Sequence, residues 1–177
     1  STVQFQSVGF VEAVAQVLAD DGDAARAARL IELELTERML MDDLGEVKHR
    51  LLRLKAMGLG ISVDDFGTGY SSLGHLKELP IDKIKIDRSF IHDLPGNRDS
   101  AAITRAIVQL GLSLGMTVTA EGVETESQRE FLVRQGCEQI QGLLVGAPMP
   151  VAAFEAWVRQ RREAERRQDP APSTSSP

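Results

Sequence analysis

Five short segments with strand character recur along this 177-residue chain, and each is followed by a helical pattern. The predicted strands are 30–36, 61–63, 82–87, 116–120 and 138–141. The predicted helices are 8–18, which precedes the first strand, and then 44–57, 73–79, 99–114, 126–135 and 151–167. Strands joined through helices run parallel and place the helices over the faces of one sheet, so the repeat predicts an α/β fold.

Charged or amide side chains stand at the carboxyl end of every predicted strand. They are Glu34 and Glu37, Asp64 and Asp65, Lys85 and Asp87, Glu121 and Glu124, and Gln141. A TIM (β/α)8 barrel gathers its active site from these ends, so the pattern predicts such a barrel with one acidic pocket that contains a single lysine. Five parallel strands cannot close an eight-stranded barrel. We therefore expect an incomplete barrel, with about three further units before Ser1.

The segment 61–72, ISVDDFGTGYSS, joins an apolar strand to two adjacent carboxylates and a turn with two glycines. Neighbouring carboxylates repel each other unless they share a cation or a proton. Mg²⁺ and Mn²⁺ prefer oxygen ligands of this kind. An acidic loop followed by a serine helix cap would also explain the segment. The glycine turn and the other strand ends favour the metal site.

Composition excludes several classes of protein. A net charge of −6 and a pI near 5.1 argue against a nucleic acid polymer as an obligate partner. The single cysteine, Cys137, excludes an intrachain disulfide and suits the cytoplasm. No G-x-G-x-x-G motif follows the first strand, which argues against a dinucleotide-binding fold. Residues 1–168 are expected to form one domain, and 169–177 a disordered tail.

With these features assembled, the chain resembles the EAL-domain family of bacterial cyclic di-GMP phosphodiesterases. The resemblance rests on five motifs in order: ELTE at 34–37, DDFGTGYSSL at 64–73, KIDRSFI at 85–91, AEGVET at 120–125 and QG at 141–142. The Glu-Ala-Leu motif that names the family is not in this sequence. The chain therefore resembles the C-terminal two-thirds of the domain, and we expect it to be truncated at its N-terminus.

The resemblance implies hydrolysis of cyclic di-GMP to linear pGpG with two Mg²⁺ or Mn²⁺ ions. The positions that match metal ligands are Glu34, Asp64, Asp65 and Glu121. The positions that match catalytic groups are Lys85, Asp87 and Glu121, with Glu121 serving as a metal ligand or a general base. Glu124 and Gln141 match substrate contacts or residues that support the ligands.

Glu37 matches a residue that anchors the flexible loop after the aspartate pair, here residues 66–72. The alternative is that Glu37 is only an acid in the first turn of a helix. The resemblance also implies a homodimer formed through helices near the loop 64–72, and it allows sensory or cyclase-like domains upstream. The domain is expected in the cytoplasm, although missing N-terminal regions could anchor the full protein to a membrane.

One departure from the family pattern keeps an alternative open. After Gln141-Gly142 the family usually has aromatic residues, whereas this chain has Leu143 and Val145. Fewer rings would weaken stacking on a guanine base. A catalytically degenerate cyclic di-GMP receptor or protein-interaction module is therefore the alternative to the enzyme. A different metal-dependent TIM-barrel enzyme is a third hypothesis. The fragment alone is expected to be inactive.

Overall fold

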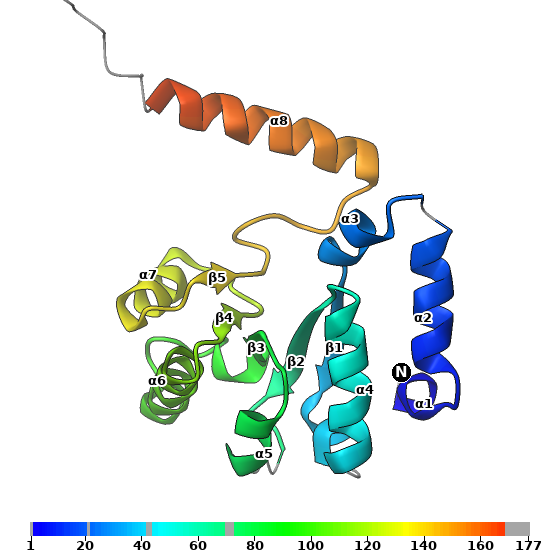
Figure 1. The fold of residues 1–177 in the computed structure, drawn as a ribbon. Helices are drawn as coiled ribbons and strands as arrows, with labels where there is room; N and C mark the ends of the chain where they lie inside the picture. Colours follow the sequence, from blue (N-terminus) through cyan, green and yellow to red (C-terminus); the bar gives the residue numbers. More distant parts are fainter. Residues whose placement is uncertain (1, 21, 42–43, 70–72, 169–177) are drawn as a thin grey trace, which may run out of the picture. The chain divides into compact units, whose positions relative to one another are not determined.

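The structure is a computed structural model that describes residues 2–20, 22–41, 44–69 and 73–168 (Figure 1). The chain divides into two compact units, residues 1–145 and residues 146–177, which are described separately. The expected tail, 169–177, lies outside the described residues.

The first unit is built on one parallel sheet of five strands. They are β1 (Glu32–Thr36), β2 (Gly60–Phe66), β3 (Lys83–Ile86), β4 (Thr117–Ala120) and β5 (Gln139–Ile140). The strands pair in sequence order, β1-β2-β3-β4-β5, and every neighbouring pair is parallel. Among the described residues β1 and β5 do not pair, so the sheet is open. The prediction of parallel strands in an incomplete barrel is confirmed.

Helices connect the strands as the repeat predicts. Three short helices precede the sheet: α1 (Thr2–Gln6), α2 (Phe10–Ala19) and α3 (Ala24–Arg29). The connecting elements are η1 (Glu37–Met41), α4 (Leu44–Ala56), α5 (Leu73–Glu78), η2 (Arg88–Phe90), α6 (Arg98–Ser113) and α7 (Glu126–Gln135). Helix α4 packs against β2, and α6 packs against β3 and β4 (Figure 1).

Two N-terminal elements differ from the sequence expectation. The first predicted helix begins at Phe10, because Gly9 has a left-handed φ of 92° and interrupts the helix before that point. Helix α3 was not predicted, since its sequence AARAAR offers only small apolar side chains and no clear helical stripe. Asp23 caps this helix, because its side chain accepts a hydrogen bond from the Arg26 amide.

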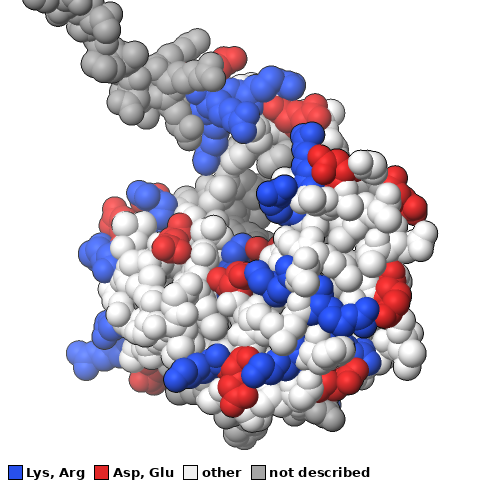
Figure 2. Space-filling view, viewed as in Figure 1, with Lys and Arg blue, Asp and Glu red and all other residues white. Residues whose placement is uncertain are grey.

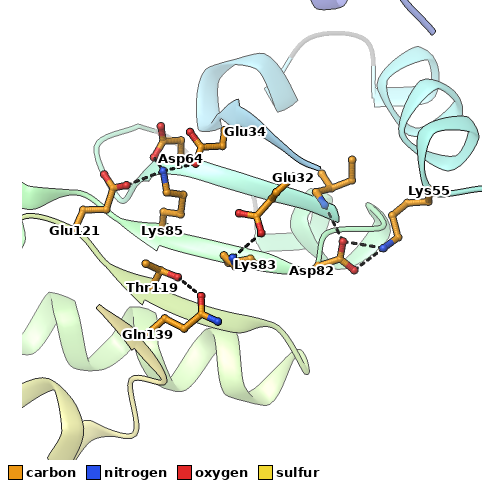
Figure 3. Close-up of polar contacts among 11 residues, drawn as sticks. Glu32, Glu34, Lys55, Asp64, Asp82, Lys83, Lys85, Thr119, Glu121 and Gln139 are labelled. Carbon is orange, nitrogen blue, oxygen red and sulfur yellow. Dashed lines mark hydrogen bonds and ion pairs between the residues drawn. The ribbon is translucent and has the colours of Figure 1, made fainter. Parts of the chain in front are cut away.

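The two faces of the sheet have opposite characters. Ile61, Val63, Ile84, Ile86 and Val118 are fully buried and belong to the core shared with the helices. Full burial of each such side chain contributes about 1.5–3 kcal/mol to folding. The residues that alternate with apolar ones on the strands are polar. Figure 3 shows Glu32, Glu34, Lys83, Lys85 and Thr119, and the sequence adds Ser62. This polar face presents side chains for chemistry.

The described part of the second unit, up to residue 168, contains one helix, α8 (Val151–Gln168). The Phe154 and Trp157 rings stack with centroids 6.0 Å apart, and the Arg161 guanidinium lies 4.5 Å from the Trp157 ring centroid. Arg159, Arg161 and Arg162 are exposed on this helix. No helix among the described residues is both long enough and apolar enough to cross a membrane.

Candidate metal and catalytic centre

Lys85 lies at the centre of a cluster of three carboxylates from neighbouring strands. Its Nζ atom lies 2.7 Å from Glu121 Oε1, 2.8 Å from Glu34 Oε1 and 3.0 Å from Asp64 Oδ1 (Figure 3). The strand register explains the meeting, because β1, β2 and β3 deliver Glu34, Asp64 and Lys85 to one edge and Glu121 follows β4 directly. The lysine side chain is only 7% exposed.

The carboxylates determine the charge state of Lys85. Burial alone would lower the pKa of the ammonium group, but contacts with Glu121, then Glu34 and Asp64, outweigh it and hold the pKa well above its usual range. Lys85 is therefore a fixed positive charge at neutral pH. In this arrangement the ammonium group can orient an anion or a water molecule.

Asp64, Asp65 and Glu121 form the group best suited to hold a metal ion. One carboxylate oxygen from each lies within 4.8 Å of the other two. Asp64 Oδ1 is buried and accepts no well-aligned hydrogen bond from the described residues, although the Lys85 ammonium lies 3.0 Å away as an ion-pair partner. An all-oxygen donor set, one of whose oxygens is buried, fits a hard divalent cation such as Mg²⁺ or Mn²⁺.

A β-bulge brings the two adjacent aspartates together. Val63 pairs with Ile84 and Phe66 pairs with Ile86, so β2 contains one more residue than β3 over this interval. Asp65 has a left-handed φ of 54°, which is uncommon for a residue other than glycine. On a regular strand the two side chains would point to opposite faces. The bulge lets both carboxylates approach Glu121. The expected strand ended at Val63, whereas the observed one continues through both aspartates.

The Asp65 carboxylate is held under electrostatic strain. Desolvation raises its pKa, the nearby charges of Asp64 and Asp87 raise it further, and Lys85 opposes them. A bound cation would offset this repulsion.

Glu37 binds the glycine turn that follows the aspartates. It lies in η1 and is 3% exposed, and its Oε2 accepts hydrogen bonds from the Gly67 amide at 3.0 Å and the Gly69 amide at 3.3 Å. Gly69 lies so close that an added Cβ would be 2.9 Å from Glu37 Oε1. The rest of the expected loop, 70–72, lies outside the described residues.

The other expected site residues lie at the margin of the cluster. Asp87 caps η2, where its Oδ1 accepts hydrogen bonds from the Ser89 amide and hydroxyl groups. Desolvation opposes ionisation of Asp87, but these hydrogen bonds and the Arg88 charge outweigh it and lower its pKa. In the described part of the chain Asp87 makes no ion pair with Lys85, and the exposed side chains of Glu124 and Gln141 make no hydrogen bond to the cluster.

A polar pair on the same face was missed at the sequence level. Thr119, the register partner of Lys85, forms a hydrogen bond of 3.0 Å between its Oγ1 and Gln139 Oε1 (Figure 3). The alternation of polar and apolar residues in TVTAE, 117–121, was the signal that could have identified Thr119.

Charges of both signs are interspersed outside this centre. On the face of the first unit shown in Figure 2, Lys and Arg side chains lie among Asp and Glu side chains. The described residues of that face therefore form no continuous basic surface of the kind that binds nucleic acid polymers.

Comparison with known proteins identifies relatives of the whole first unit. The family model for the EAL domain matches residues 1–148. The bifunctional diguanylate cyclase/cyclic di-GMP phosphodiesterase MucR of Pseudomonas aeruginosa is 50% identical over 158 residues. These residues are 89% of this chain and 23% of MucR, so the chain spans about a quarter of that relative.

Solved structures give the same result. The PaMucR phosphodiesterase in complex with c-di-GMP matches with a TM-score of 0.82 and 47% identity, covering 87% of this chain and 61% of that one. Klebsiella pneumoniae BlrP1 with manganese and cy-diGMP matches with a TM-score of 0.67 and 32% identity, covering 77% of this chain and 36% of that one.

Proposed function

The chain belongs to the EAL domain family, and on this premise we propose that it forms part of a cyclic di-GMP phosphodiesterase domain that produces linear pGpG. The observation that carries the proposal is the meeting of Asp64, Asp65 and Glu121 beside the buried Lys85 ammonium. Phosphodiester hydrolysis needs positive charge near the phosphoryl oxygens and an activated water, and such a site is built to gather cations.

We assign the metal-holding role to Asp64, Asp65 and Glu121, with Glu34 contributing from the other side of Lys85. Two Mg²⁺ or Mn²⁺ ions held there would polarise the phosphoryl group and lower the pKa of a bound water. Glu34 lies outside the three-carboxylate group and is half exposed, at 51%, so it has room to turn toward an ion.

The remaining roles follow from charge and position. Lys85, as a fixed ammonium, orients a substrate phosphate or the attacking water. Glu121 has the position of a metal ligand or a general base. Asp87 supports the site through the turn that follows β3. The exposed Glu124 and Gln141 contact the substrate from the rim, and Glu37 anchors the loop that carries the aspartates.

The partners of this domain are also proposals. The ligand is cyclic di-GMP, which is bound in the PaMucR structure. A homodimer would form through helices near the loop 64–72. MucR is bifunctional and much longer than this chain, which supports sensory or cyclase-like domains elsewhere in the full protein. We place the domain, residues 1–168, in the cytoplasm.

The deciding experiment measures conversion of cyclic di-GMP to pGpG with Mn²⁺ in the full protein that contains this chain. We expect turnover in the wild type and its loss in Asp64→Asn, because an amide supplies no negative charge to hold a cation. Arg134→Ala is the control, since Arg134 is exposed on α7 and pairs only with Glu130 among the described residues. Near-normal turnover of Asp64→Asn would remove this residue from the metal site.

A receptor is the second candidate function. Leu143 is 62% exposed at a position where the family usually has an aromatic residue. If the full protein binds cyclic di-GMP without cleaving it at saturating Mn²⁺, the receptor replaces the enzyme. A protein that neither binds nor cleaves the dinucleotide would contradict both functions.

A further inference from the structure

Glu121 belongs to a short backbone segment, 121–123, that follows β4. Hydrogen bonds to the end of β3 and to the chain after β5 hold this segment in place. On the β3 side, the Glu121 amide donates a hydrogen bond to the Ile86 carbonyl at 3.1 Å. On the β5 side, the Val123 amide donates to the Gln141 carbonyl at 3.0 Å, and the Leu144 amide donates to the Val123 carbonyl at 3.0 Å. Val123 is fully buried, so the segment has little freedom to move.

Two glycines allow the flanking chains to approach this closely. A Cβ atom added to Gly122 would lie 2.7 Å from Arg88 Cβ. A Cβ atom added to Gly142 would lie 2.2 Å from the Val123 carbonyl oxygen and 2.4 Å from its amide nitrogen. These distances are far inside van der Waals contact, so a side chain at either position forces a shift of the segment that carries Glu121 or of the chain packed against it.

We propose that Gly122 and Gly142 are positioning residues that fix the Glu121 carboxylate beside Lys85, Asp64 and Asp65. This inference rests on the proposed metal role of Glu121. Its physical basis is that ligand geometry must be held within a fraction of an ångström, and residues behind the ligands supply that precision. Gly122 acts through the stem of Arg88, and Gly142 acts through the backbone of Val123.

The chain contains a matched control for the backbone cost of the substitution. Gly122 has a φ of 69° and Gly115 has a φ of 71°, so alanine meets nearly the same conformational strain at both. A Cβ atom at Gly115 would meet nothing within 4 Å. A difference between Gly122→Ala and Gly115→Ala therefore reports the steric contact with Arg88.

The contact also predicts a specific rescue. Arg88→Gly removes the Cβ atom that an alanine at position 122 would meet, whereas Arg88→Ala removes the guanidinium group and keeps that atom. Gly122→Ala should thus be rescued by Arg88→Gly and not by Arg88→Ala. For Gly142→Ala no side-chain rescue is expected, because the obstructing atoms belong to the backbone of Val123.

The experiment titrates Mn²⁺ into the full protein that contains this chain, and into each variant of it, by electron paramagnetic resonance, with amide hydrogen exchange over 121–123 as a second measurement. We expect Gly122→Ala to weaken Mn²⁺ binding about 10-fold relative to Gly115→Ala and to speed exchange of the segment. Adding Arg88→Gly to Gly122→Ala should restore most of the Mn²⁺ affinity and most of the protection of 121–123 from exchange. The single variant Arg88→Gly is the reference for this double variant.

Equal behaviour of Gly122→Ala and Gly115→Ala in both measurements would overturn the inference, as would equal rescue by Arg88→Ala and Arg88→Gly. If the wild-type full protein binds no Mn²⁺, the proposed metal role of Glu121 fails. Hydrogen exchange then decides by itself whether the two glycines hold the segment.

Discussion

At the scale of single residues, Lys85 supplies the positive charge that balances the carboxylates of the cluster. Its ammonium lies within 3.0 Å of three carboxylates, and removing it would leave these acids facing one another. Because the pKa of Lys85 is raised in the folded protein, its contribution to stability is complete below the unfolded value of about 10.5 and is lost as the pH rises through the folded value.

We therefore expect the metal-free wild type to exceed Lys85→Met in free energy of unfolding at neutral pH. The difference should stay constant up to about pH 9.5 and shrink above about pH 10.5. Urea unfolding at intervals from pH 7 to pH 11 measures it, and Lys77→Met, an exposed lysine of α5, is the control. A difference that does not depend on pH would show that the ion pairs do not stabilise the fold.

Asp65 has a left-handed backbone conformation and a charged side chain. Two substitutions distinguish the effect of the conformation from the effect of the charge. Asparagine tolerates the left-handed conformation but has no charge, whereas valine is disfavoured at φ 54°. We expect Asp65→Asn to keep the stability of the fold and to lose Mn²⁺ affinity. Asp65→Val should lose affinity and also about 1–3 kcal/mol of stability. Thermal unfolding of the metal-free proteins compares them, and equal melting temperatures would argue against strain at the bulge.

At the scale of elements, η1 and the turn after β2 act as a pair through Glu37. Glu37→Ala removes the acceptor for the Gly67 and Gly69 amides, so we expect faster hydrogen exchange at both and lower phosphodiesterase activity in the full protein. Arg38→Ala is the matched control, because Arg38 is the exposed neighbour of Glu37 in the same short helix. Unchanged exchange together with full activity would contradict the anchoring role.

The elements could be predicted from the sequence where their pattern was periodic. The repeat of strand and helix patterns predicted the parallel sheet, and the charged or amide residues after each strand predicted the polar strand ends. The bulge at Asp65 could not be predicted, because it depends on pairing with β3, a contact between segments distant in sequence. The cap formed by Asp87 was hidden for a related reason, since the same carboxylate fits a role beside Lys85 equally well.

At the scale of the whole molecule, the open sheet determines what this chain can do alone. The described sheet leaves β1 and β5 without a partner on their outer sides, and exposed strand edges promote association between molecules. Glu34 is also half exposed in this state, so the carboxylate group is not enclosed.

We expect the 177-residue chain to convert cyclic di-GMP to pGpG more slowly than the full protein by at least about 100-fold, since a site that lacks its surroundings loses both ligand geometry and protection from water. Turnover with Mn²⁺ at equal concentrations of folded protein compares the two, and size-exclusion chromatography reports association. Comparable rates would show that the chain holds every essential group.

The ammonium of Lys85 has a consequence for how this protein matures. It occupies the carboxylate cluster as an internal counterion, so the acids need no external cation while the chain folds. One positive charge does not neutralise Glu34, Asp64, Asp65 and Glu121 together, and the remaining negative charge attracts divalent ions. Under the proposed function, we therefore expect this chain to reach its fold without metal and to bind divalent ions in a later, separate step.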